Sequence, residues 1–83
     1  MKILWDEHKR VVNLERHGMD FADLDETFFE RSAIAPAKLG RLIAVGRLRS
    51  GVIVVVFVEL GTEAVSVISM RPASRKERRG IDG

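Results

Sequence analysis

The stretch from Val65 to Arg79 reads VSVISMRPASRKERR and joins a β-branched run to a basic cluster through a single proline. Its valines and isoleucine favour a strand, because branched side chains fit a pleated surface better than a helix. Pro72 has no backbone N–H for a sheet ladder, so the strand ends there or lies at an edge. Ser74 and Glu77 have the spacing of a capping box. The stretch therefore predicts a strand, a bend, and a short basic helix with a capped first turn.

The start of the chain predicts an extended segment and then a helix. Ile3–Trp5 is a short apolar run, read as a strand or an extended lead-in. Asp6 closes this run, and a carboxylate there accepts hydrogen bonds from the first free N–H groups of a helix. We expect that helix to reach Arg16 or His17 and to stop at Gly18 in the left-handed conformation.

The two sides of this helix differ in polarity when its residues are spaced 100° apart. The apolar side, expected to face the core, consists of Val11, Val12 and Leu14. The opposite side, expected to be available to a ligand, consists of Lys9, Asn13 and His17.

A second helix is expected to begin at Asp20 by the same capping argument. Phe21, Leu24 and Phe28 recur at helical spacing and predict its core-facing stripe. Its other side is acidic and carries Asp23, Asp25, Glu26 and Glu30.

The rest of the chain predicts strands. Residues 32–37 form an irregular link with an edge strand, because Pro36 is unfavourable inside a sheet. A strand over residues 41–47 follows, with Gly46 a candidate bulge. Turns at Ser50-Gly51 and Gly61-Thr62 would join successive strands as antiparallel hairpins.

The strand from Val52 to Val58 is apolar at every position, which predicts a central strand buried on both faces. Two N-terminal helices can cover one face. The other face then needs the C-terminal helix, a second copy of the chain, or a different protein.

The chain length predicts one domain over residues 1–83, and the order of the expected elements predicts an α+β fold, in which two N-terminal helices pack on a small antiparallel sheet and a short basic helix ends the chain. Cysteine is absent, which excludes disulfides, thiolate catalysis and cysteine-based metal sites. The start of the chain has no signal-peptide pattern and the longest apolar run is too short to span a membrane, so a cytoplasmic protein is expected.

The net charge is only +2, but the charges are segregated. Residues 1–33 carry eight acids against five Lys or Arg, whereas residues 71–83 carry five basic residues against two acids. A local basic face attracts phosphate even when the whole molecule is nearly neutral.

Arg71 is the strongest candidate for phosphate binding, because it follows an apolar strand directly and is held by the sheet. Its guanidinium could form two parallel hydrogen bonds to a phosphate, and Arg75 could reach the same anion. A solvated helix end is the alternative interpretation of the basic cluster. His17 is a candidate proton carrier, with a helix-cap role as its alternative. His8 and His17 form no metal motif, and Trp5 is expected in the core.

The residues also resemble those of the BrnT-type toxins of bacterial toxin–antitoxin pairs. The matching sequence motifs are Trp5-Asp6-Glu7-x-Lys9, Asn13-Leu14-x-x-His17-Gly18, Phe21 with Phe28-Phe29, and Val67-Ile68-Ser69-x-Arg71-x-Ala73-Ser74-x-x-Glu77-Arg78. They cover nearly the whole chain in order.

The resemblance implies a RelE-like fold and a small cytoplasmic endoribonuclease that slows translation, with no cofactor. It also implies an antitoxin that binds and neutralises the toxin and that is itself DNA-binding. Four positions depart from the pattern. Phe57 and Ile81 stand where relatives usually have tyrosine, and Leu60 and Ser66 stand where arginine is expected.

We therefore expect a metal-independent ribonuclease. Arg71 and Arg75 would hold the phosphate, and Glu77 or His17 would carry the proton. The residues expected to steer the RNA backbone are Lys9, Arg47, Arg78 and Arg79. The rival hypothesis is a binding module without catalysis that contacts a partner protein or nucleic acid, and the four departures favour it.

Overall fold

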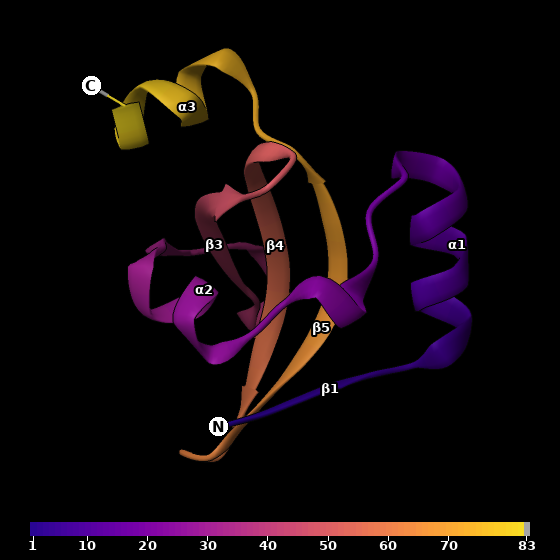
Figure 1. The fold of residues 1–83 in the computed structure, drawn as a ribbon. Coiled ribbons are helices and arrows are strands. Elements are labelled where there is room, and N and C mark those ends of the chain that lie inside the picture. The colour runs from indigo at the N-terminus through magenta and orange to yellow at the C-terminus, as the bar shows by residue number, and fades with distance from the viewer. Residues whose placement is uncertain (83) are drawn as a thin grey trace.

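The computed structural model describes residues 1–82, and Figure 1 shows how they fold. The strands are β1 (Lys2–Trp5), β2 (Ala33–Pro36), β3 (Leu42–Leu48), β4 (Gly51–Leu60) and β5 (Ala64–Pro72). The helices are α1 (Glu7–His17), α2 (Glu26–Arg31) and α3 (Arg75–Asp82), with 3-10 turns at Phe21–Asp23 and Lys38–Gly40.

The five strands form one mixed sheet in the order β1-β5-β4-β3-β2. The expectation of an antiparallel sheet was wrong at one edge, because β1 pairs parallel to β5. The first and last strands meet there after the whole chain has passed between them, and no local sequence signal encodes that pairing. The β3–β4 and β4–β5 pairs are antiparallel, as the turns predicted, and β2 also pairs antiparallel to β3.

The predicted bulge at Gly46 was also wrong. Gly46 pairs with Ile53 in regular register, and the irregularity lies between Val56 and Phe57 of β4. The reason for the glycine is a close approach from α2. A Cβ at position 46 would collide with the Ser32 hydroxyl and lie 3.0 Å from the Phe28 ring.

The main core lies on the face of the sheet that the segment from Phe21 to Arg31 covers (Figure 1). Phe29 packs edge-on against Phe57 of β4 at 5.1 Å between ring centroids, and Trp5 packs edge-on against Phe21 at 6.3 Å. The expected core role of Trp5 is thus confirmed. The buried members of this core are Phe21, Leu24, Phe28, Phe29, Ala44, Ile53, Val55, Phe57, Val65, Val67 and Met70.

The second helix is broken into two short pieces, which corrects the expectation of one helix from Asp20. Asp20 does act as a cap, accepting from the Ala22 N–H, but the turn that it caps spans only three residues. Asp25 then accepts from the Phe28 N–H and begins α2. The break still leaves the predicted apolar stripe buried in the core.

The predicted bounds of α1 are confirmed, since Asp6 caps its start and Gly18 ends it at φ 66°. Its predicted core face is wrong. Asn13 is the buried residue of α1, whereas Val11 and Leu14 are 39% and 38% exposed. The side expected to be free for a ligand therefore faces β5 instead.

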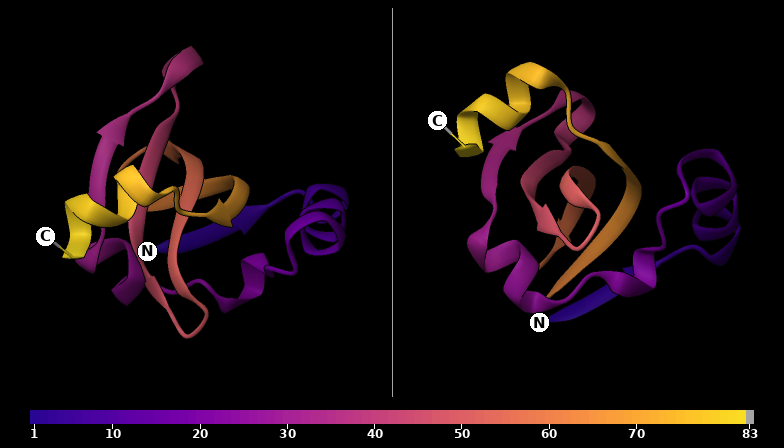
Figure 2. Two further views of the ribbon diagram at one scale, coloured as in Figure 1. Left: turned by 90° about the horizontal axis from the view of Figure 1, so that it is seen from above. Right: turned by 45° about the horizontal axis from the view of Figure 1, so that its top comes forward.

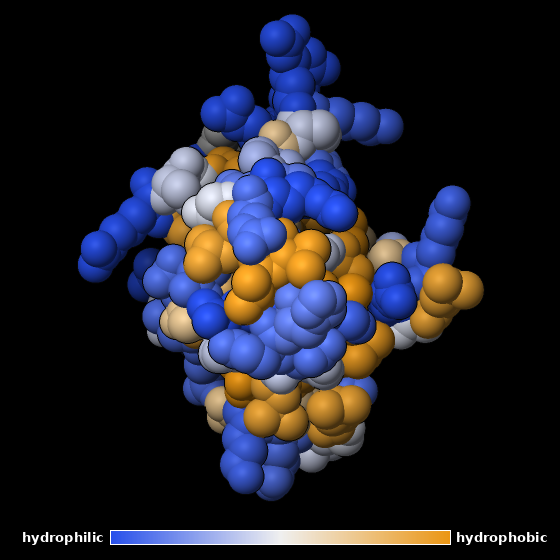
Figure 3. Space-filling view, turned by 90° about the vertical axis from the view of Figure 1, so that its right-hand side faces the viewer, coloured by the Kyte–Doolittle hydropathy of each residue, from blue (hydrophilic) through white to orange (hydrophobic). Residues whose placement is uncertain are grey.

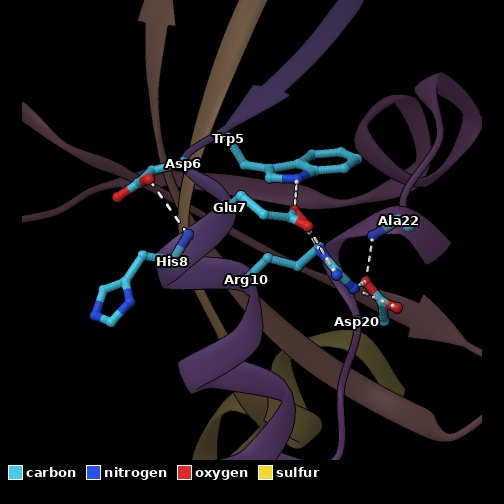
Figure 4. A network of polar contacts seen from close by, with 7 residues as sticks. All are labelled: Trp5, Asp6, Glu7, His8, Arg10, Asp20 and Ala22. Atoms are coloured by element: carbon cyan, nitrogen blue, oxygen red, sulfur yellow. Dashed lines mark hydrogen bonds and ion pairs between the residues drawn. The ribbon is translucent and has the colours of Figure 1, made fainter.

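A network of hydrogen bonds and ion pairs links the start of α1 to the turn at Asp20 (Figure 4). The Arg10 guanidinium donates to both Glu7 oxygens at 2.6 and 2.8 Å and to both Asp20 oxygens at 3.1 and 3.2 Å. The Trp5 indole N–H also donates to Glu7, at 3.2 Å. The bonds from Arg10 lower the pKa of Glu7, and the Asp20 pKa is lowered first by the Ala22 N–H and then by Arg10.

α3 lies over one end of the other face of the sheet, above the β3–β4 region, and β1 forms the sheet edge beside β5 (Figures 1 and 2). Ala73 and Ile81 pack against Val45, Val52 and Val54, which form a second small core. The central strand is thus covered on the core face from Ile53 to Phe57, and on the other face it is covered at its α3 end. No helix within residues 1–82 is long and apolar enough to cross a bilayer.

Candidate active-site groove

A groove of about 330 Å³ lies between α1 and the second half of β5. Basic side chains from both elements line it, and its floor contains Asn13, Ile68 and Ser69. The cationic and imidazole side chains of the groove are His8, Lys9, Arg16, His17 and Arg71. Two segments more than fifty residues apart in the sequence thus form one concave, positively charged surface, which favours an anionic ligand.

Asn13 fixes how α1 sits beside this groove. Its side-chain carbonyl accepts from the Met70 backbone N–H at 3.0 Å, and its side-chain amide donates to the Met19 carbonyl at 3.1 Å. This residue satisfies a backbone donor at the edge of β5 that no strand covers. Because Lys9 and His17 stand four residues to either side of Asn13, the same bond turns both toward β5.

Arg71 is the groove residue whose geometry is best defined. Its Nη1 and Nη2 donate to the two Glu77 oxygens at 2.8 and 2.9 Å, and Nη1 also donates to the Pro72 carbonyl at 3.3 Å. The Nε–H and the second Nη2–H make no hydrogen bond with any residue that the structure describes. These two donors lie on one edge of the planar guanidinium and match two oxygens of a phosphate.

Glu77 connects this arginine to the start of α3. Its Oε1 also accepts from the Ser74 N–H at 2.8 Å, and the Ser74 hydroxyl accepts from the Glu77 N–H at 3.2 Å. The predicted capping box is therefore confirmed. The hydrogen bonds from Arg71, helped by those from Ser74, lower the Glu77 pKa to about 2. A carboxylate with so low a pKa stays ionised at neutral pH and binds protons weakly.

The other predicted site residues lie apart from the groove. Arg75, Arg78 and Arg79 are exposed on α3. Arg47 lies on β3 and lines a different pocket, of about 290 Å³, between α2 and α3. The predicted set thus divides into a groove group, namely Lys9, His17 and Arg71 with Glu77 behind it, and a basic surface on and near α3.

Three groove residues were missed by the sequence argument: His8, Arg16 and Ser69. The helical positions of His8 and Arg16 depend on the rotation of α1, which was assigned incorrectly. The buried Asn13 between Lys9 and His17 was the signal that could have corrected that rotation. Within residues 1–82, no group of three or more His, Asp or Glu side chains could hold a metal ion.

The family model for the ribonuclease toxin BrnT of type II toxin–antitoxin systems matches residues 5–77. The chain belongs to the BrnT family. The crystal structure of the Brucella abortus ribonuclease toxin BrnT, solved at 1.1 Å resolution, matches 90% of this chain and 99% of its own with 50% identity and a TM-score of 0.83. A search of the curated proteins finds no match.

The BrnT match confirms the resemblance found in the sequence and the α+β fold of five strands and three helices. As members of a ribonuclease toxin family act within a toxin–antitoxin pair, this chain has RNA as its target and an antitoxin as its protein partner. Of the four departures, Phe57 is buried in the main core and Ile81 packs on the second one, so neither side chain lines the groove.

Proposed function

We propose that this BrnT-type toxin cleaves RNA in the groove between α1 and β5 without a metal ion, and that the cleavage slows translation. The observation that supports the site most strongly is the orientation of Arg71. Two of its donors are held by Glu77, and two adjacent donors remain for a phosphate.

RNA supplies its own nucleophile, so the protein has to position the chain and stabilise charge. The 2′-oxygen attacks the neighbouring phosphorus while its proton passes to a base, and the bond from phosphorus to the 5′-oxygen breaks. The 5′-oxygen takes a proton from water. The products are a 2′,3′-cyclic phosphate and a 5′-hydroxyl end. Arg71 would hold the non-bridging oxygens as negative charge develops on them.

His17 is the proton carrier that we favour, rather than Glu77. It lines the same groove as Arg71, and histidine is the side chain suited to proton exchange near neutral pH. Both Glu77 oxygens accept hydrogen bonds from Arg71, and the Glu77 pKa is about 2. We assign Glu77 as a positioning residue that orients Arg71.

The exposed cations around the groove would steer the RNA backbone. Lys9 lies on the wall of the groove, and Arg75, Arg78 and Arg79 extend the positive surface along α3. Contacts of this kind raise affinity for any sequence and weaken with salt. Arg75, which the sequence predicted to hold the phosphate with Arg71, is assigned to this group because it is exposed on α3.

The test is cleavage of a single-stranded RNA in EDTA, followed by analysis of the product ends. We expect cleavage to persist in EDTA and to leave a 2′,3′-cyclic phosphate. An RNA with one 2′-deoxy group at the scissile position should bind but resist cleavage there. Cleavage that requires a divalent ion, or that proceeds at the deoxy position, would contradict the mechanism. Binding without any cleavage would support the rival binding module.

A further inference from the structure

Half of the second sheet face is apolar and open to solvent. Residues paired in register share a face, which places Leu4, Ile43, Val56, Val58 and Leu60 together on the face opposite the main core. We call these residues the open strip. Leu4 and Leu60 are 46% and 47% exposed, and the other three are half-buried. α3 covers the far end of this face, where Val45, Val52 and Val54 lie, and Ile43 at the near end of the strip packs against that cluster.

The strands contribute charges of one sign to this face, although the charge of Arg71 is paired with Glu77 of α3. The charged side chains that the strands place on this face are Lys2, Arg47 and Arg71. Among residues 1–82, no strand contributes an acid to the face, because Glu59 pairs with Val65 on the core side. The exposed residues of α3 add Arg75, Lys76, Arg78 and Arg79 at the end away from the strip. The surface is therefore apolar at its β1 end and basic at its α3 end.

We propose that the antitoxin binds this face with one segment, whose apolar residues cover the open strip and whose acidic residues lie against α3. The proposal rests on the proposed function in one respect, since a partner held there would compete with RNA for the α3 cations. A buried aliphatic patch with a charged rim of opposite sign is the usual anatomy of a protein–protein interface.

A second copy of this chain fits the surface less well, because self-association would bring like charges together around the strip. RNA fits the basic end but not the apolar end. Nucleic-acid bases bind to proteins by stacking on aromatic rings, and the strip contains none. Trp5 and Phe57 both point to the opposite face, where they pack in the main core.

Figure 3 shows a further area of exposed hydrophobic surface between hydrophilic side chains on the side of α1. Val11 and Leu14 are the partly exposed apolar residues of that helix. Their neighbours on the outer side of α1 include Glu7 and Glu15, so this surface lacks the basic character of the open strip. We therefore assign the antitoxin segment to the sheet face.

The experiment measures the affinity of the purified toxin for the antitoxin encoded beside it, by calorimetry. The double variant Leu4→Ser/Leu60→Ser removes two exposed side chains of the strip. The matched control is Ile34→Ser, which is 48% exposed and belongs to β2 but shares a face with Ala44 of the main core. We expect Kd to rise about tenfold or more for the double variant and less than about twofold for the control.

The acidic half of the segment is tested by Lys76→Glu on α3. We expect this variant to weaken antitoxin binding by roughly three- to tenfold at low salt, with the difference shrinking as salt is added. Circular dichroism of every variant checks that the fold is retained, and single-residue Leu60→Ser replaces the double variant if that one unfolds.

Three results would overturn the proposal. The first is a wild-type toxin that does not bind the antitoxin, or a strip variant that binds it as tightly as wild type. The second is a dimer of the free toxin that the strip variant converts to monomer, which would assign the strip to a second copy. The third is a loss of affinity of the strip variant for a 2′-deoxy-protected RNA that equals its loss of affinity for the antitoxin. This result would assign the strip to RNA binding. Cleavage by the free strip variant should stay within about twofold of wild type; loss of cleavage by the wild type itself would instead count against the proposed function.

Discussion

Asn13 is the residue that sets the orientation of α1. It is 6% exposed and bridges the Met70 N–H and the Met19 carbonyl, so its amide links the helix, the following turn and β5. These two hydrogen bonds specify one rotation of α1 about its axis, because any other rotation would break both of them.

Substitution of Asn13 should therefore destabilise the domain. Asn13→Ala leaves a buried backbone N–H and a carbonyl without their partners, and we expect the free energy of unfolding to fall on the order of 2–4 kcal/mol. Leu14→Ala, at an adjacent partly exposed position, should cost less than about 1 kcal/mol. Urea denaturation measures both. Equal losses would show that the rotation of α1 is not set by Asn13.

The ion pair between Arg71 and Glu77 makes a pH-dependent contribution to stability. The pKa of Glu77 lies at about 2 in the folded chain, below its ordinary value of 4.5. Because the folded pKa is the lower one, the contribution is present above about pH 4.5 and is lost as the pH falls toward 2. Arg71 is 41% and Glu77 22% exposed, so solvent screening reduces it to on the order of 1 kcal/mol.

Glu77→Gln isolates this contribution. We expect the variant to be less stable than wild type at pH 7 by on the order of 1 kcal/mol, and the two stabilities to converge as the pH falls through the range from 4.5 to 2. Thermal melts across that range supply the comparison. A stability difference that does not change with pH would mean that Glu77 acts through packing or through the capping box alone.

At the level of elements, the signals that end β5 and begin α3 were accurate, whereas the predicted bulge at Gly46 and the single second helix were wrong. β5 ends at Pro72, and Ser74 and Glu77 form the predicted capping box. Both features were predictable because each depends on residues only a few positions apart. To predict the break in the second helix, Asp25 would have had to be considered as a second N-cap beside Asp20. The parallel pairing of β1 with β5 depends on the whole fold.

The α2 segment supplies a prediction at this scale. Phe28 is 4% exposed and packs edge-on against Phe29 at 5.4 Å between ring centroids. Phe28→Ala should lower the free energy of unfolding by roughly 3–5 kcal/mol, a large part of the stability of so small a domain. Lys9→Ala, an exposed change on α1, should leave it nearly unchanged. Equal melting temperatures for Phe28→Ala and wild type would contradict the assigned core.

Across the whole molecule, the uneven distribution of charge gave the most useful sequence signal for the candidate site. The basic residues near the C-terminus pointed to Arg71 and α3, and the groove contains Arg71. The sequence could not show that His8 and Arg16 join it, because their positions depend on the bond between Asn13 and β5. Nor could it show that Glu77 already occupies two donors of Arg71, since that contact depends on how the chain bends at Pro72.

The folded chain separates two kinds of cation that the sequence presents as one cluster. Arg71 is held at the end of β5 by defined hydrogen bonds, whereas Arg79 is exposed on α3. A held guanidinium can stabilise a transition state, and an exposed one mainly raises the local concentration of RNA. These two roles have different kinetic consequences.

The most direct test of this account is the single-turnover rate of RNA cleavage in EDTA for Arg71→Ala and Arg79→Ala at increasing RNA concentration. We expect Arg71→Ala to lose about 10²-fold or more of the rate at saturating RNA, and Arg71→Lys to recover little of it, because an ammonium lacks the two-pronged geometry. Arg79→Ala should bind RNA more weakly, with a flatter salt dependence, and should recover its rate as RNA is added. Equal losses for the two alanine variants, both reversed by added RNA, would contradict the assignment of Arg71 to the scissile phosphate.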